Sequence, residues 1–168
     1  CTIIIINIQC NMPKLFLLVL LLALNFTHYV EANDDLGYKH YHNGDYKEAL
    51  KVWSHEVEEG NREAMYNIGL LYFFGKGVER DLTLAFEYCE KAAYKGSSRA
   101  QNNLAYMYMK GLGTKKDYML AYAWSEIAIE NGYNSQNIRD DASIHLTPAM
   151  YKDAKQFFAK LKREIKDD

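Results

Sequence analysis

A 36-residue internal repeat is the feature that most restricts how this chain can fold. Residues 62–96 align with residues 98–132 at a constant offset of 36, and the matches occur in the same order. The matched pairs are Ala64–Ala100, Asn67–Asn103, Tyr72–Tyr108, Gly75–Gly111, Gly77–Gly113, Asp81–Asp117, Leu84–Leu120, Ala85–Ala121 and Gly96–Gly132. A fixed period of this length is typical of stacked repeat proteins, in which each unit buries its apolar face against the next.

Each unit is predicted to contain two helices joined by a glycine-containing turn. Apolar residues at helical spacing indicate a first helix over 62–74, and Gly75 and Gly77 end it because glycine tolerates positive φ. Asp81 is the expected N-cap of a second helix over 82–95. Two antiparallel helices per unit make an all-α stack the expected architecture.

Shorter helical units flank the two complete repeats. The upstream unit keeps Asp45, Ala49 and Gly60 at the offset of 36 but has a shorter turn between its helices. Downstream, Thr147 and Pro148 are suited to begin a closing helix. The expected organisation is repeats at about 34–61, 62–97 and 98–133, followed by capping helices within 135–166.

An unbroken apolar run of ten residues, 15–24, precedes the repeats. A helix that crosses a bilayer needs about 20 such residues, whereas about ten is typical of the core of a signal peptide. Lys14 lies before the run, and Val30 and Ala32 follow it at positions that a signal peptidase accepts. These features predict a cleaved signal peptide over 12–32, with an uncleaved membrane anchor as the alternative.

Cleavage at this site would leave a repeat domain over 33–168 that begins at Asn33. Residues 1–11 lie upstream of a methionine and are interpreted as upstream or flanking translation. The expected location is therefore periplasmic or secreted. Cys89 would be the one cysteine of the mature chain, so no internal disulfide is expected, and its apolar surroundings indicate a buried small side chain.

Charge and motif spacing argue against several functional classes. The 20 basic and 22 acidic residues give a net charge of −2, which does not suit a protein that binds nucleic acid through phosphate contacts. His40 and His42 are two residues apart on a predicted helix, so they point in different directions and do not form a joint metal site. No metal or other cofactor is expected, and membrane contact is expected only through an uncleaved signal.

The repeat pattern resembles the Sel-1-like repeat family, a relative of the tetratricopeptide repeat. The residues that carry the resemblance in the first complete unit are Ala64, Ile68, Gly69, Tyr72, Gly75, Gly77, Val78, Asp81, Ala85, Tyr88, Ala92, Ala93 and Gly96. The resemblance implies a right-handed α/α superhelix that acts as an adaptor. It also implies similarity to small exported bacterial members, which are binding or assembly factors of the envelope or take part in host interaction.

A partner-binding surface is expected where the first helices of the units line the concave face. Positions on these helices that the repeat pattern does not fix are available for a ligand. Aromatic rings and amides at such positions suit an extended peptide, because rings supply contact area and amides bind backbone groups. The candidate residues are Tyr66, Leu70, Phe73, Asn102, Tyr106 and Met109.

The sequence therefore favours a non-enzymatic adaptor of the bacterial envelope or secreted fraction that binds a protein or peptide partner. One alternative is an envelope hydrolase that processes cell-wall or β-lactam substrates, which would need a nucleophile or carboxylate beside a base in a pocket. Family members linked to penicillin-like compounds have a disulfide in each repeat, which this chain lacks. A second alternative is a secreted effector that acts on a host through the same fold.

Overall fold

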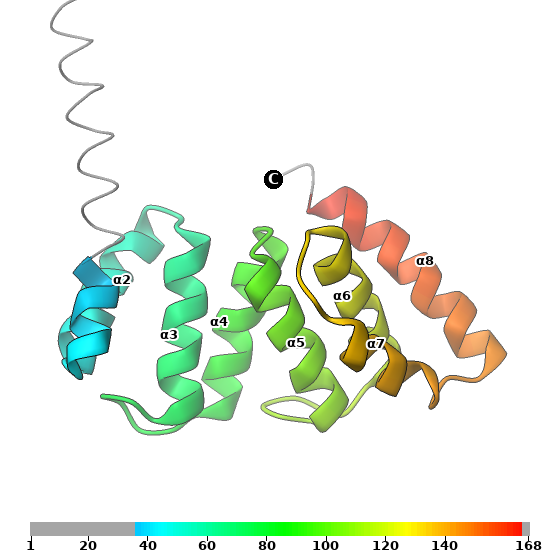
Figure 1. Ribbon diagram of the computed structural model, residues 1–168, viewed down its shortest axis with the longest axis horizontal. Coiled ribbons are helices and arrows are strands. Elements are labelled where there is room, and N and C mark those ends of the chain that lie inside the picture. Colours follow the sequence, from blue (N-terminus) through cyan, green and yellow to red (C-terminus); the bar gives the residue numbers. More distant parts are fainter. Residues whose placement is uncertain (1–35, 166–168) are drawn as a thin grey trace, which may run out of the picture.

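The computed structural model describes residues 36–165, and all regular structure in this range is helical. A helical segment at 36–43 precedes seven complete helices. Their bounds are α2 (Tyr46–Glu58), α3 (Arg62–Phe74), α4 (Leu82–Tyr94), α5 (Ser98–Lys110), α6 (Tyr118–Glu130), α7 (Gln136–Ser143) and α8 (Pro148–Glu164). The predicted all-α fold of stacked helix pairs is confirmed (Figure 1).

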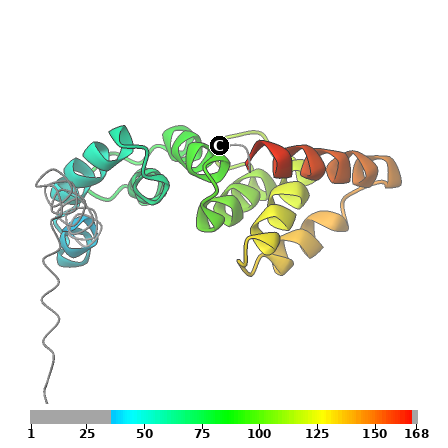
Figure 2. The same cartoon turned by 90° about the horizontal axis from the view of Figure 1, so that it is seen from above.

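The helices follow one another along the long axis of the molecule in chain order, as both views show (Figures 1 and 2). Most contacts form between helices adjacent in sequence, from α2 with α3 through to α6 with α7. The exceptions are α8, which turns back and packs along α6, and a smaller contact between α5 and α7. This nearest-neighbour pattern is that of a solenoid, in which each unit is held mainly by the units on either side.

The capping residues expected from the repeat occupy their predicted positions. Gly75 and Gly111 end α3 and α5 in the left-handed region, at φ 66° and 70°. Asp81 accepts a hydrogen bond from the amide of Leu84, and Asp117 accepts the equivalent bond at the start of α6. These bonds explain why the second helix of each complete repeat begins where it does.

The second glycine of each long loop permits a close contact between repeats. A Cβ on Gly113 would overlap the carbonyl oxygen of Leu82, the first residue of α4, and one on Gly77 would overlap Tyr46, the first residue of α2. Both contacts join a loop to the second helix of the preceding unit. The repeat pattern identified these glycines as turn residues, and the structure adds that they allow successive units to approach.

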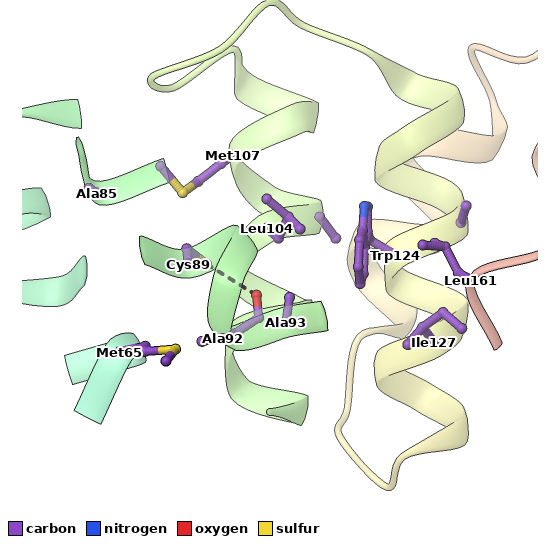
Figure 3. Close-up of a cluster of buried hydrophobic side chains, with 13 residues drawn as sticks. Met65, Ala85, Cys89, Ala92, Ala93, Leu104, Met107, Trp124, Ile127 and Leu161 are labelled. Carbon is purple, nitrogen blue, oxygen red and sulfur yellow. Dashed lines mark hydrogen bonds between the residues drawn. The ribbon is translucent and has the colours of Figure 1, made fainter. Parts of the chain in front are cut away.

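The largest core cluster runs from α3 to α8 (Figure 3). Trp124 and Leu161 are almost fully buried in it, which explains why α8 returns to α6. Within the first complete repeat, Tyr72 of α3 and Tyr88 of α4 stack with ring centroids 6.0 Å apart. Small side chains at the helix crossings let the larger ones fill the space between units.

Part of the sequence analysis concerns residues outside the described range. The expected signal peptide at 12–32, the upstream segment at 1–11 and the expected new N-terminus at Asn33 all lie there. Within residues 36–165, no helix combines the length and apolar composition needed to cross a membrane.

Candidate functional site

An apolar pocket of about 190 Å³ lies between the first helices of the two complete repeats. The helices α3 and α5 form its sides, and two residues of α4 complete its lining. Below it is called the α3–α5 pocket, and its lining residues are Tyr66, Gly69, Leu70, Phe73, Phe74, Ala85, Cys89, Asn103, Tyr106 and Met107.

The pocket exists because α3 carries its bulky side chains beside a glycine. Tyr66, Leu70 and Phe73 are spaced by four and three residues, so they share one face of α3. Gly69 lies on the α4 side, where an added Cβ would be 3.3 Å from the carbonyl oxygen of Ala85. The absence of a side chain at this position lets α3 and α4 pack closely while the neighbouring rings line the pocket.

Two aromatic side chains at the mouth of the pocket face solvent. Phe74 is 58% exposed and Tyr106 is 40% exposed, although both are large apolar groups. Clustered aromatic surface at the edge of a pocket is a feature of protein interaction sites. The pocket can therefore hold one apolar side chain of a ligand between these two rings.

Amide and phenol groups supply the polar atoms of the rim. The Nδ2 of Asn103 donates to the hydroxyl of Tyr66 at 3.2 Å, and Asn102 donates to Asn103. Burial raises the pKa of Tyr66 to about 12, so its hydroxyl keeps its proton at neutral pH. The rim thus presents neutral hydrogen-bonding groups of the kind that bind peptide backbone.

A charged pair links the N-terminal ends of α3 and α5 beside this rim. Glu63 and Arg99 occupy the same position in successive repeats and form a salt bridge. The carboxylate of Glu63 also accepts a hydrogen bond from Ser97, and the guanidinium of Arg99 lies 5.4 Å from the ring centroid of Tyr66. These contacts hold the two first helices at a fixed separation at one end of the pocket.

Cys89 lies at the floor of the pocket but is not arranged as a nucleophile. Its thiol donates to the carbonyl oxygen of Ala100 at 3.2 Å, as the dashed line in Figure 3 shows. Burial raises the pKa of the thiol to about 12, so it remains protonated. The residues that line this pocket include no carboxylate, histidine or serine, and the geometry gives no support to the hydrolase alternative.

The structure brings together four of the six candidate residues and separates the other two. Tyr66, Leu70, Phe73 and Tyr106 line the α3–α5 pocket. Asn102 lies on the rim, where its amide contacts Asn103 rather than the pocket interior.

Met109 does not contribute to the groove, which corrects its expected placement. It is 7% exposed and packs in a separate cluster with Tyr122 and Ala142. Phe73 occupies the same repeat position one unit earlier and does line the pocket. The two differ because α7 packs beside α5 and buries Met109.

Six lining residues were not among the candidates, and two of them, Asn103 and Phe74, bear on ligand binding at the rim and the mouth. Asn103 matches Asn67 at the offset of 36, and a repeated amide on a mostly apolar helix face was a usable signal. Phe74 was missed because it directly precedes the turn glycine, at a position where a helix-ending residue was expected. Its exposure could not be deduced from helical spacing alone.

The histidines near the N-terminal end of the described chain, His40 and His42, are not among the residues that line this pocket. His40 is 3.8 Å from the carboxylate of Asp45, and His42 stacks against Tyr38. In residues 36–165 no group of three or more histidine, cysteine or acidic side chains is arranged to hold a metal ion.

Comparison with solved structures identifies bacterial relatives of this fold. A protective antigen with an SLR fold, present in uropathogenic Escherichia coli strains, matches with a TM-score of 0.76 and 28% identity, over 80% of this chain and 30% of that one. A Sel1 repeat protein from Oxalobacter formigenes matches with a TM-score of 0.56 and 29% identity, over 61% of this chain and 44% of that one.

Among curated proteins, two plant proteins match a short part of the chain. HRD3A and HRD3B of Arabidopsis thaliana, both ERAD-associated E3 ubiquitin-protein ligase components, are 41% and 37% identical over 54 residues. The aligned part is 32% of this chain but only 8% and 9% of those proteins. The chain thus spans less than a tenth of the length of these relatives.

The family comparison agrees with the repeat geometry. The Sel1 repeat family matches residues 62–97 and 98–133, which are the two units that carry α3 to α6. These units form the α3–α5 pocket and its floor, and the solved structures that share the fold are bacterial SLR proteins. Residues 62–133 are therefore two Sel1 repeats, and the chain has the SLR fold.

Proposed function

We propose that this protein is a non-enzymatic scaffold that binds an extended segment of a partner protein on the face formed by its first helices. Sel1-like repeats are typically protein-interaction scaffolds, which supports the general class. The α3–α5 pocket is the proposed anchor point for the partner. The observation that carries the proposal is this pocket, with exposed Phe74 and Tyr106 at its mouth.

The chemistry of the pocket fits an apolar side chain flanked by peptide backbone. A volume of about 190 Å³ is comparable to one large side chain, and the lining is mainly aliphatic and aromatic. Asn102 and Asn103 lie beside it, where their amides can pair with the backbone groups of an extended peptide. The plant relatives, as ubiquitin ligase components, also belong to a larger assembly.

Selection from a library of displayed short random peptides tests this proposal. We expect the enriched peptides to share one large apolar residue, and we expect Tyr106→Ala to weaken their binding by about tenfold. Leu70→Glu should abolish binding, because it places a charge in an apolar pocket. Circular dichroism would show that both variants remain folded.

Met150→Ala is the matched control, because Met150 is 37% exposed and Tyr106 is 40% exposed. Met150 lies at the start of α8, away from the α3–α5 pocket. Its truncation should leave the affinity unchanged. A failure to enrich any peptide, or equal affinity for the wild type and the Leu70→Glu variant, would reject the proposed function.

We also propose that the protein is exported to the envelope or secreted. The support is the ten-residue apolar run at 15–24 and the small or aliphatic residues Val30 and Ala32 after it. N-terminal sequencing of the protein recovered outside the cytoplasm should then begin at Asn33. Recovery of membrane-bound protein that still carries residues 12–32 would favour the anchor instead.

A further inference from the structure

We propose that the partner segment carries an acidic side chain two positions from its apolar anchor, and that Lys110 binds this carboxylate. The inference rests on the proposed function, because it takes the α3–α5 pocket as the anchor site. It adds the charge of the partner and the spacing of its two recognised residues.

The edge of the solenoid at the C-terminal ends of α3 and α5 carries an excess of positive charge. The two long loops lie along this edge, which is the lower one in Figure 1. Residues 75–81 and 110–117 together contain five basic and three acidic residues. Below they are called the basic edge, and their charged members are Lys76, Glu79, Arg80, Asp81, Lys110, Lys115, Lys116 and Asp117.

Two of the three acidic residues of the basic edge are already engaged. Asp81 and Asp117 accept hydrogen bonds from the first turns of α4 and α6. Among residues 36–165, no carboxylate lies within ion-pair distance of Lys76, Arg80 or Lys110. Lys76 donates a hydrogen bond to the hydroxyl of Tyr41 at 2.7 Å, and Arg80 donates to a backbone carbonyl oxygen. Lys110, which is exposed, is therefore the cation among these three that is available to an acidic ligand.

The basic edge adjoins the mouth of the pocket. The Nζ of Lys76 lies 5.9 Å from the ring centroid of Phe74, and the Nε of Arg80 donates to the carbonyl oxygen of Phe73 at 3.0 Å. Lys110 is exposed and follows Tyr106 by one helical turn, so both share a face of α5. A ligand that enters the pocket between the aromatic rings thus meets positive charge on the side of the loops.

Helix geometry sets the spacing between the two recognised residues. Four residues of an α-helix advance about 6 Å, which separates Tyr106 from Lys110 along α5. An extended peptide advances about 3.3 Å per residue, and its alternate side chains point to the same side. A peptide lying along α5 therefore places two side chains against it when they are two positions apart, with the intervening one directed away.

A second hollow, with a mixed lining that includes Met109, Tyr118 and Ile144, lies beside Lys110. It has a volume of about 130 Å³ and includes Lys110, Lys116 and His145, with Asp141 as a carboxylate in its lining. The ring of His145 stacks on Tyr118 with centroids 4.1 Å apart. Lys110 thus lines this second hollow and shares a face of α5 with Tyr106, which lines the α3–α5 pocket.

Charge reversal at Lys110 tests the inference with the peptides enriched from the library. We expect the selected peptides to carry aspartate or glutamate two positions from the apolar anchor. We expect Lys110→Glu to lower their affinity by about fivefold or more, and a peptide with lysine in place of the acidic residue to recover it on this variant. Lys51→Glu, on the exposed surface of α2, changes the net charge equally and should leave the affinity unchanged.

The outcomes separate this inference from the function on which it rests. If Leu70→Glu abolishes binding but the peptides show no acidic preference and Lys110→Glu binds them normally, the scaffold function stands and the acidic partner is rejected. Equal losses in the Lys110→Glu and Lys51→Glu variants would also reject it, because the effect would then come from overall charge. If Leu70→Glu has no effect, the pocket itself is not the anchor.

Discussion

Glycine conformation alone does not account for the second glycine of each long loop, as a comparison of Gly113 with Gly132, which follows α6, makes clear. Gly113 has φ +70°, and an added Cβ would overlap the carbonyl oxygen of Leu82. Gly132 has φ +83°, but an added Cβ there would meet no atom within 4 Å. The two positions share the conformational requirement and differ in the contact between repeats.

Substitution of Gly113 and Gly132 by alanine should separate the cost of a positive φ from the cost of disturbing the contact between repeats. We expect Gly132→Ala to reduce the free energy of unfolding by about 1–2 kcal/mol, the cost of the left-handed conformation for an L-residue. Gly113→Ala should cost clearly more, because α4 must also move away. Urea denaturation measures both changes, and equal losses would show that the loop contact does not contribute.

The thiol of Cys89 should make stability depend on alkaline pH. Burial raises its pKa from 9.0 to about 12, so above pH 9 the unfolded chain releases a proton that the folded chain retains. The contribution of this thiol to the free energy of unfolding is therefore fully present below pH 9, and it is lost as the pH rises toward 12. Between pH 8 and pH 10 the free energy of unfolding should therefore fall by roughly 1 kcal/mol.

Cys89→Ala removes the titrating group and provides the comparison. The variant starts from a lower stability, because a buried side chain is shortened. Its free energy of unfolding should then fall less between pH 8 and pH 10 than that of the wild type. If urea denaturation gave the same fall in the free energy of unfolding for the wild type and for Cys89→Ala, this loss could not be assigned to Cys89.

An aspartate at the same repeat position precedes α2, α4 and α6, but only the last two of these aspartates cap their helix with a side-chain hydrogen bond. Asp81 and Asp117 are extended N-caps whose carboxylates accept an amide hydrogen bond. Asp45 occupies the same repeat position before α2 but makes no side-chain cap bond and lies 3.8 Å from His40. The shorter turn of the first unit changes the backbone angles at this position and removes the cap.

Asp117→Ala should therefore destabilise the protein by about 1 kcal/mol, and Asp117→Asn should recover most of the loss because asparagine is also a good cap. Asp45→Ala should cost only a few tenths of a kcal/mol, as expected for an exposed residue without a cap bond. Thermal unfolding of the three variants checks this order. A cost for Asp45→Ala equal to that for Asp117→Ala would contradict it.

The helices could be predicted from the sequence more completely than the pocket. The period of 36 defined α3 at its observed bounds, and the second helix of that unit ends at Tyr94 rather than at residue 95. The pocket depends on which way each side chain points. Met109 shows that the repeat position alone does not predict this direction. Its repeat position is that of Phe73, but packing against α7 in the following unit decides which of the two is exposed.

At the scale of the whole molecule, the ends of the stack depend on different cores. Trp53 is 2% exposed and belongs to a cluster confined to the first units, where it packs against Tyr38. Trp124 is 1% exposed and lies in the cluster that extends from α3 to α8. A destabilising substitution in the first cluster should therefore loosen the first units and leave the later helices folded, as in other nearest-neighbour stacks.

Hydrogen exchange on two matched tryptophan variants tests this difference. In Trp53→Ala, amides of residues 36–58 should exchange faster while those of α6 and α8 remain protected. In Trp124→Ala, protection should fall from α3 to α8. Uniform loss of protection in both variants would show that the chain unfolds as a single cooperative unit instead.

The salt bridge between Glu63 and Arg99 limits how this array can grow by tandem duplication. The two residues occupy one position in consecutive repeats, so a duplicated 62–97 unit would place glutamate opposite glutamate. A duplicated 98–133 unit would place arginine opposite arginine. Either longer array would therefore set like charges against each other at this position unless a compensating substitution accompanied the duplication.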